Sequence, residues 1–487
     1  MLPTALASIL ASRWLNGTPR TWLLLATSVC FYVALDAAAL PRMAGVVVAS
    51  WLGGLIIERR RIGIVLAGVV AATLCPLLLS KYMPWLRLML DTGQLWNAGD
   101  LDSRGVPPGL SFVTLQAIGN VVDVFRRRVT ASRSLVDQAL FLAFFPQLVA
   151  GPIERTEALR PQLEAPCRPS SGVYYEALKL ALWGYVMKLV LADTLAGPIE
   201  QLLRLPAQEA PAGLLLALPL FSARLYLDFY AYSCIAVALG QLHGVHLTMN
   251  FAHPYGATDL GAFWRRWHIS LSSWWRDYVY LPLGGRKHGM LRESVAVLIV
   301  FLLSGLWHGA GLGFVLWGVC HGVGLLVERA GQSIWGAKHP IGRSPARRLL
   351  DAAKTLGTGT FVTACWLPFL ASGDRTVPVL IGRLLQAVRG VGGEYCSAQC
   401  ACDDPCLGCR TRTRRSYLRS SHGAVVLASV SVHTILDGVG CGADESPRRK
   451  PFAPWRLRRT NVHILRLLIV GGSSRDFDEV VPLSCIA

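Results

Sequence analysis

The sequence predicts an all-helical, polytopic membrane protein with roughly nine to eleven transmembrane helices. Of its 487 residues, 53% are hydrophobic and only 16% are charged, whereas about a quarter of the residues in a soluble domain are charged. The mean hydropathy is also positive, at +0.42. The hydrophobic residues are gathered into long runs, and about 20 apolar residues are enough for a helix to cross a bilayer.

These apolar runs define the expected spans. The long runs cover residues 21–40, 41–57, 62–80, 173–192, 213–240, 294–327 and 355–371. Shorter runs surround Leu110 and Phe141. A cleavable signal peptide carries a basic residue before its apolar part. Residues 1–12 have no such basic residue, so we expect the first hydrophobic segment to stay in the protein.

The formal net charge of +18 raises the possibility of nucleic-acid binding. The basic residues, however, form short clusters at the ends of apolar runs, such as Arg59 to Arg61 and Arg126 to Arg128. This placement is typical of the cytoplasmic loops of membrane proteins, which are rich in Lys and Arg. We therefore favour membrane lipid over nucleic acid as the partner of these charges.

Residues 258–287 are too polar to cross lipid, because aromatic and basic side chains alternate closely along them. Tryptophan and tyrosine rings suit the level of the lipid headgroups. We expect one or two amphipathic helices here, lying at the cytoplasmic side of the membrane or dipping into it.

The run 294–327 contains no Asp, Glu, Lys or Arg, and as one helix it would be about 51 Å long, against a hydrocarbon core of about 30 Å. It must therefore break, and Gly305, Gly309, Gly311 and Gly313 mark the expected place. Irregular backbone at membrane depth is tolerated only inside protein or beside a water-filled cavity. His308, which lies among these glycines, is thus expected to face an interior tunnel.

An imidazole within an apolar stretch is a functional candidate. His308 could accept a proton from a hydroxyl that attacks a thioester, since its ordinary pKa is near neutrality; alternatively, it could hydrogen-bond to a neighbouring helix for packing. His268 offers a second imidazole, although such a residue can equally lie on a helix surface or cap a helix. His321 is interpreted as structural.

Charged side chains supply further candidates. Arg224 and Asp228 are four residues apart and are expected to form an ion pair within a span. A basic cluster could hold the phosphates of a coenzyme A or phosphopantetheine donor, or could simply meet anionic lipid headgroups. Its members are Arg265, Arg266, Arg276, Arg286 and Lys287.

The sequence changes character after about residue 385. Residues 386–487 are rich in cysteine and arginine and have no convincing span. Cys406 and Cys409 form a C-x-x-C pair, the usual start of a zinc site, but the other cysteines are irregularly spaced. A disordered tail, or a tail read in the wrong frame, is the preferred hypothesis, and no metal site is predicted.

Several ordered motifs resemble those of the membrane-bound O-acyltransferase family, in particular its bacterial alginate O-acetylation branch. They are LIIERRR at 55–61, PPGLSFVTLQ at 107–116, VVDVFR at 121–126, FFPQLVAGPIER at 144–155, RPQL at 160–163, FWRRWHISLSSWWRDYVYLPLGG at 263–285 and LSGLWHGAGLGFVLWGVCHG at 303–322. The resemblance covers about residues 20 to 380 and defines a membrane acyltransferase domain at 1–385.

The resemblance implies a ring of membrane helices around a funnel or tunnel, where a cytoplasmic acyl donor and an acceptor meet from opposite faces. It implies that His308 is catalytic and that His268 lies on the tunnel and supports it. The basic cluster, apart from the resemblance, offers Arg265, Arg266, Arg276 and Lys287 as candidates for binding the donor. The implied donor is acetyl-CoA or an acyl-carrier thioester.

The resemblance also implies a setting for the reaction. The acceptor would be a polysaccharide outside the cytoplasm, a periplasmic acetyltransferase would complete the transfer, and the chain would lie in the bacterial inner membrane.

The alternative from another class is a transporter in which His308, Asp228 and Arg224 form a relay. A membrane scaffold without catalysis would have no need of His308.

Overall fold

The computed structural model describes residues 2–92, 106–165, 168–205, 211–335 and 345–370, together with residue 382. Within these ranges the chain forms helices joined by turns and short loops, and no strand occurs in them. The prediction of an all-helical protein is confirmed for this part of the chain. The predicted domain boundary after residue 385 and the tail 386–487 lie outside the described residues.

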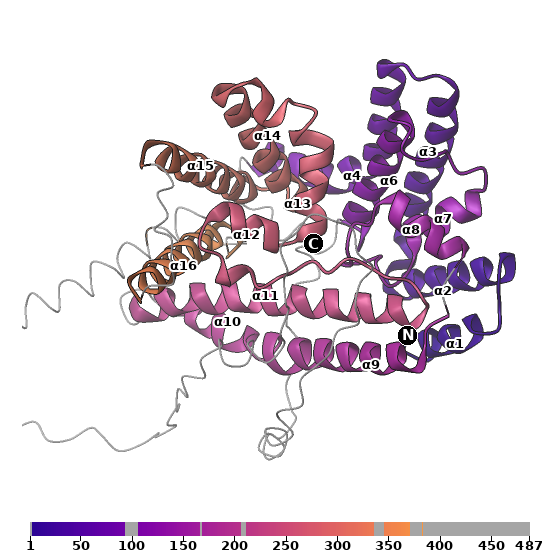
Figure 1. Ribbon diagram of the computed structural model, residues 1–487, viewed down its shortest axis with the longest axis horizontal. Helices are drawn as coiled ribbons and strands as arrows, with labels where there is room; N and C mark the ends of the chain where they lie inside the picture. The colour runs from indigo at the N-terminus through magenta and orange to yellow at the C-terminus, as the bar shows by residue number, and fades with distance from the viewer. Residues whose placement is uncertain are drawn as a thin grey trace, which may run out of the picture. The chain divides into compact units, whose positions relative to one another are not determined.

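The first group of helices precedes residue 165. Its members are α1 (Leu2–Ser12), α2 (Thr18–Asp36), α3 (Leu40–Arg59), α4 (Gly63–Thr92), α6 (Leu110–Phe125), α7 (Leu135–Ala143) and α8 (Thr156–Glu164). Helix α3 packs against both α4 and α6, and Figure 1 shows α3 and α6 side by side. Buried aliphatic and aromatic side chains such as Leu24, Met43 and Phe141 form the core between these helices.

The middle of the chain forms a pair of long, packed helices. They consist of α9 (Ser171–Tyr185), a π-helical segment (Val186–Ala192), α10 (Ala196–Arg204) and α11 (Pro211–Leu242). Ser170 begins α9, because its hydroxyl accepts a hydrogen bond from the amide of Val173 at 3.4 Å, as an N-cap does. Helix α11 runs alongside α9 (Figure 1).

The third group contains the short helices of the aromatic and basic segment and the helices that follow it. They are α12 (Leu260–Arg266), α13 (Ile269–Trp275), a π-helical turn (Arg276–Tyr280), α14 (Met290–His308), α15 (Leu312–Trp335) and α16 (Pro345–Cys365). Short helices occur in this segment, as predicted, and their position at the cytoplasmic side stays a prediction. Their rings are buried against the protein, since Trp267 and Trp274 are each only 4% exposed, so the segment enters the protein interior.

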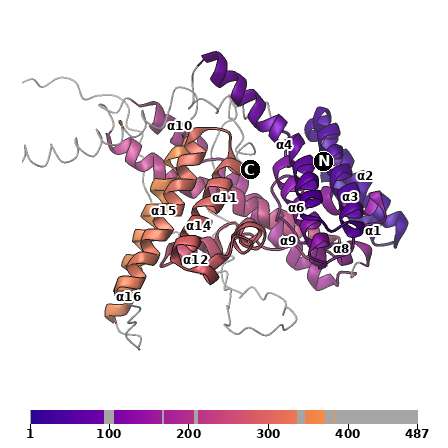
Figure 2. The same cartoon turned by 90° about the horizontal axis from the view of Figure 1, so that it is seen from above.

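The long apolar run breaks where the glycines predicted. Helix α14 ends at His308 and α15 begins at Leu312. The two helices fold back on each other, and Figures 1 and 2 both place them side by side. The contact is very close, because a Cβ atom at Gly305 would lie 2.2 Å from the carbonyl oxygen of Phe314, and one at Gly318 would lie 2.3 Å from that of Phe301.

Six helical stretches in the described residues are long and apolar enough to cross a membrane. They are Thr18–Arg59, Gly63–Arg87, Ser171–Arg204, Leu215–Leu242, Met290–His308 and Leu312–Ser333. This is fewer than the predicted nine to eleven. The run around Phe141 forms only a nine-residue helix, α7, and α16 includes charged residues such as Arg347 and Asp351, which lower its hydropathy.

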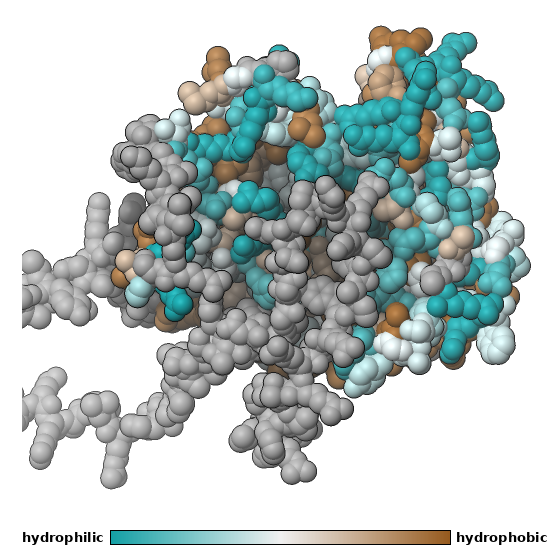
Figure 3. Space-filling view, in the orientation of Figure 1, coloured by the Kyte–Doolittle hydropathy of each residue, from teal (hydrophilic) through white to brown (hydrophobic). Residues whose placement is uncertain are grey.

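Apolar side chains lie exposed along several of these stretches. Leu182 on α9 is 66% exposed and Ile64 on α4 is 80% exposed, and Figure 3 shows hydrophobic residues reaching the surface. Extended apolar surfaces of this kind are unusual on soluble monomers. They suit contact with lipid chains, so the chain is a multi-pass membrane protein.

Candidate active site

His268 lies at the turn between α12 and α13 in a backbone conformation that is uncommon for residues other than glycine, with φ 45° and ψ 56°. Asn250 stabilises this turn. Its backbone carbonyl accepts from the amide of Ile269 at 2.9 Å, and its side-chain oxygen accepts from the amide of Ser270 at 3.2 Å. These bonds fix the start of α13 and hence the direction of the His268 side chain.

The segment FFPQLVAGPIER supports the same turn from the other side. The amide of Ile153 donates to the hydroxyl of Ser270 at 3.0 Å. Next in sequence, the buried carboxylate of Glu154 accepts from the backbone amide of Thr248, and burial raises the pKa of Glu154. Two motifs separated by more than 90 residues therefore meet at His268.

His308 is the last residue of α14, and a different helix holds the backbone there. The ammonium of Lys81 on α4 donates to the carbonyls of Trp307 and His308, at 2.5 and 3.0 Å. The hydroxyl of the next residue, Tyr82, donates to the carbonyl of Leu306 at 2.5 Å. The end of α14 is therefore anchored to α4.

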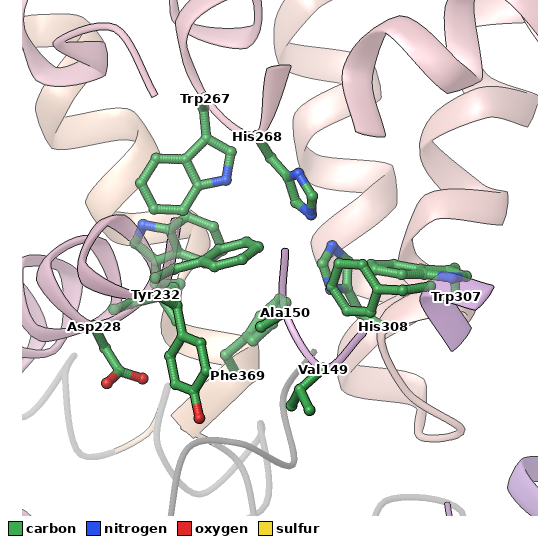
Figure 4. Close-up of a pocket in the computed structure, with 13 residues that line it drawn as sticks. Val149, Ala150, Asp228, Tyr232, Trp267, His268, Trp307, His308 and Phe369 are labelled. Atoms are coloured by element: carbon green, nitrogen blue, oxygen red, sulfur yellow. The ribbon is translucent and has the colours of Figure 1, made fainter. Parts of the chain in front are cut away.

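His268 and His308 line one pocket, whose empty space of about 620 Å³ includes the part that is open to the surroundings. Figure 4 shows both imidazole rings directed into it from different elements. The remaining lining residues are Phe112, Val149, Ala150, Leu225, Asp228, Phe229, Tyr232, Trp267, Trp307, Trp366 and Phe369. His308 therefore faces a pocket, and the tunnel expected there stays a prediction.

His268 is only 1% exposed, and neither of its ring nitrogens has a hydrogen-bond partner among the described residues. Burial, followed by the nearby His308, holds the pKa of His268 well below its ordinary value. The ring is therefore neutral at pH 7, with one nitrogen free to accept a hydrogen bond and the other free to donate one.

Aromatic rings hold the two imidazoles in place. The ring centroid of Trp307 lies 4.9 Å from that of His308, 6.2 Å from that of His268 and 5.2 Å from that of Phe112. The Trp317 ring lies 5.0 Å from His308 on another side. Such packing restricts ring rotation and leaves the pocket walls largely apolar.

The pocket also has a polar part, formed by Asp228 and Tyr232 of α11 (Figure 4). The carboxylate of Asp228 lies 2.7 Å from the ammonium of Lys188, which also pairs with Asp193 at 2.8 Å. The expected ion pair between Asp228 and Arg224 is replaced by this one. The π-helical segment Val186–Ala192 carries Lys188, and π-helical turns are frequent at functional sites.

The basic residues predicted to bind the donor do not line the pocket. Arg265, whose side chain is 73% exposed, lies 3.8 Å from Asp259, and Arg276, 61% exposed, pairs with Asp277 at 2.8 Å. Arg266 donates to a backbone carbonyl, that of Gly256, and Lys287 is exposed. Their role as donor ligands remains a prediction for the protein surface.

His321 lies behind the pocket wall. It is fully buried, and its ring contacts those of Trp317 and Trp264, each with centroids 5.0 Å apart. It does not line the pocket, in keeping with the structural role expected of it.

Two lysines near the site were not singled out from the sequence. Lys81 follows the apolar run 62–80 directly, so it looked like the end of a span, whereas α4 continues to Thr92. Lys188 lies within the run 173–192. In both cases a lysine lies within or next to an apolar run. Such a lysine usually pairs with an acidic side chain or with backbone carbonyls, and this signal could have indicated both residues.

Comparison with known proteins identifies the family of the chain. Residues 61–349, more than half of the chain, match the membrane-bound O-acyltransferase family. The chain belongs to this family. The matched residues include His268, His308, Lys81 and Asp228, so most of the pocket is part of the membrane-bound O-acyltransferase region.

Individual curated proteins are also similar to the chain. A probable alginate O-acetylase of Pseudomonas aeruginosa is 36% identical over 266 residues, which are 55% of this chain and 49% of that protein. A peptidoglycan O-acetyltransferase of Helicobacter pylori is 30% identical over 347 residues, 64% of each chain. A teichoic acid D-alanyltransferase of Streptococcus thermophilus is 30% identical over 237 residues, 46% of this chain and 56% of that one.

The chain therefore spans about half the length of the alginate O-acetylases that it matches.

Proposed function

We propose that the chain is a membrane O-acyltransferase that moves an acetyl group from a cytoplasmic thioester donor toward hydroxyls of an extracytoplasmic polysaccharide such as alginate. The observation that carries this proposal is the convergence of His268 and His308, from separate elements, on one interior pocket. The relatives named as O-acetylases of alginate and peptidoglycan support both the acyl group and the kind of acceptor.

The proposed reaction needs a base at the alcohol. A neutral His308 imidazole accepts the proton of the attacking hydroxyl as its oxygen forms a bond to the thioester carbonyl carbon. When the tetrahedral intermediate collapses, the carbon–sulfur bond breaks and the thiolate leaves, taking up that proton. The products are an ester and a free thiol.

His268 would assist this step from a separate element of the same pocket. Because neither of its ring nitrogens has a partner in the part of the chain that the structure describes, the ring can donate a hydrogen bond to the carbonyl oxygen of the thioester, where negative charge develops. Donation by a neutral ring in an apolar pocket is stronger than the same bond in water. His308 thus acts on the acceptor and His268 on the donor.

The donor in this proposal is acetyl-CoA or an acyl-carrier thioester, and no metal takes part. Arg265, Arg266, Arg276 and Lys287 would meet the donor's phosphates at the protein surface, where charge-assisted hydrogen bonds are available. A periplasmic acetyltransferase would receive the acetyl group and complete the transfer to the polysaccharide. The chain would reside in the inner membrane of a bacterium, in contact with membrane lipid and without nucleic acid.

The decisive experiment replaces His308 by Ala in cells that carry the variant as their sole copy. We expect ester-linked acetate on the cell-surface polysaccharide to fall by a factor of about 100 or more, as expected for loss of a general base. His246→Ala serves as the matched control, because the His246 side chain is exposed and away from the pocket. Each variant must be compared at equal membrane abundance.

An unchanged acetate content in the His308→Ala variant would remove the enzyme assignment. The transporter alternative would then gain support, because Asp228 shares the pocket with His308. That alternative predicts loss of solute or proton movement in the Asp228→Asn variant while the acetate content of the glycan stays normal.

A further inference from the structure

The C-terminal end of α14 exposes carbonyl groups that the helix itself cannot satisfy. The last carbonyls of any helix have no amide partner in the following turn. In α14 these include the carbonyls of Leu306, Trp307 and His308, because the chain leaves the helix at Gly309. At membrane depth little water is present to pair with them, so leaving them without donors would be costly.

Two adjacent side chains of α4 supply the missing donors. Lys81 donates to the carbonyls of Trp307 and His308, and Tyr82 donates to that of Leu306. An ammonium group is favoured at this end of a helix, where the helix dipole is negative. Lys81 is only 5% exposed, and lysine is rarely buried to this extent unless a specific partner requires it.

The contact acts on the residues that form the pocket. Lys81 binds the backbone of His308 itself and of Trp307, whose ring lies 4.9 Å from the His308 ring and 6.2 Å from the His268 ring, measured between centroids. No atom of Lys81 lines the pocket. An effect of Lys81 on acyl transfer would therefore be indirect, through the position of residues such as these two.

We infer that Lys81 is a positioning residue for the reaction, holding His308 and Trp307 at the distance from His268 that transfer requires. This inference rests on the proposed function. A displacement of about 1 Å at a reacting group can lower a rate by a factor of about 100. Lys81 is therefore expected to affect acetylation strongly although it does not line the pocket.

The test compares Lys81→Met with Lys81→Arg. Met has a similar length but neither charge nor donor, whereas Arg keeps both. Cells carrying each variant as their sole copy are assayed for ester-linked acetate on the surface polysaccharide at equal membrane abundance. We expect Lys81→Met to lose at least about tenfold and Lys81→Arg to recover a third or more of the wild-type value.

Arg87→Met is the matched control, because Arg87 is an exposed cation on the same helix. It should remain within about twofold of the wild type. The inference is overturned if Lys81→Met retains more than a third of the acetate, or if Lys81→Arg is no more active than Lys81→Met.

Tyr82→Phe keeps the inference testable if Lys81→Met fails to accumulate. This change removes only the hydroxyl that binds Leu306, and we expect a loss of about threefold with normal abundance; full activity would count against the anchoring role. His308→Ala is assayed in parallel. If His308→Ala is active, the proposed function fails, whereas an inactive His308→Ala beside an active Lys81→Met refutes the positioning role alone.

Discussion

The backbone of His268 adopts the left-handed conformation, with φ 45°, which costs about 1 kcal/mol for most residues and less for Asn. This conformation yields a prediction that separates folding from chemistry. His268→Asn should fold nearly as well as the wild type but lose at least about tenfold in glycan acetylation, because it lacks the imidazole. His268→Ala should lose similar activity and be less stable than His268→Asn by about 1 kcal/mol.

Thermal unfolding of the purified variants in detergent, together with the acetate assay, checks both parts. If His268→Asn acetylated normally, the ring would have no chemical role. If the two variants were equally stable, the backbone conformation would not limit the choice of residue.

A second histidine gives the fold a pH dependence. His243 follows α11 directly; its ring bonds to the carbonyl of Leu239 at 2.8 Å and to the hydroxyl of Ser8 at 3.1 Å. Burial, with a smaller contribution from Arg20, lowers the pKa of His243 from 6.5 to about 4. The unfolded chain therefore takes up a proton between these values while the folded chain does not.

The contribution of His243 to the free energy of unfolding is therefore fully present above pH 6.5 and is lost as the pH decreases from 6.5 toward 4. The loss attributable to this one group approaches about 3 kcal/mol. Thermal melting in detergent across this range should show the decline in the wild type, and His243→Gln should flatten it. An equally steep decline in His243→Gln would assign the effect to other groups.

At the same scale, the sequence indicated the two imidazoles that line the pocket but not the residues that support them. His308 and His268 stand out because imidazoles within distinctive motifs are rare. Lys81 and Asn250 gave no comparable signal, since each acts through backbone groups of residues more than 15 positions away. Such contacts depend on how helices pack, which local patterns do not determine.

At the scale of elements, the packing of α14 on α15 depends on two glycines. A Cβ atom at Gly318 would meet the backbone oxygen of Phe301 at 2.3 Å, so the helices would have to separate. We expect Gly318→Ala to destabilise the protein by about 1 to 3 kcal/mol and to reduce acetylation, because α14 ends at His308. Melting temperature and acetate content measure the two effects.

Gly331→Ala is the control within the same helix, because a Cβ atom there would meet nothing within 4 Å. It should be neutral or more stable by up to about 1 kcal/mol, since alanine favours a helix. Similar behaviour of the two variants would show that close approach of α14 and α15 is unimportant.

The sequence was most informative where an apolar run is too long for a single transmembrane helix and must therefore contain a break. The uncharged run 294–327 is too long for one crossing, and its glycines indicated the turn that the structure places at Gly309. The π-helical segment around Lys188 was not foreseen, because the hydropathy of a π-helical turn does not differ from that of an α-helix. The span expected around Phe141 is not found, because α7 has only nine residues, and hydropathy alone does not show where a helix ends.

At the scale of the whole membrane region, basic clusters gather at one end of the first helix group. Arg59 ends α3, and Glu58 beside it binds both Arg133, at 2.6 Å, and the amide of Ala131. The basic residues after α6 are therefore at the same end as those after α3. The positive-inside tendency predicts that this end faces the cytoplasm.

Cysteine labelling in intact cells tests this orientation on a single helix. Ala38 precedes α3 and Arg60 follows it, and both are exposed. Ala38→Cys should react with a thiol reagent that cannot cross the inner membrane, whereas Arg60→Cys should react only after permeabilisation. The reverse pattern would place the donor side of the pocket opposite to the proposal.

The aromatic walls around His268 and His308 also affect how readily water could hydrolyse a bound thioester. A water molecule is a competing nucleophile for any thioester, and it is retained in a cavity only where several polar groups bind it. Rings such as Phe112, Trp307 and Phe369 offer few such groups, so bulk solvent gains little by entering. If the proposed function holds, these walls would slow the hydrolysis of a bound thioester before its alcohol arrives.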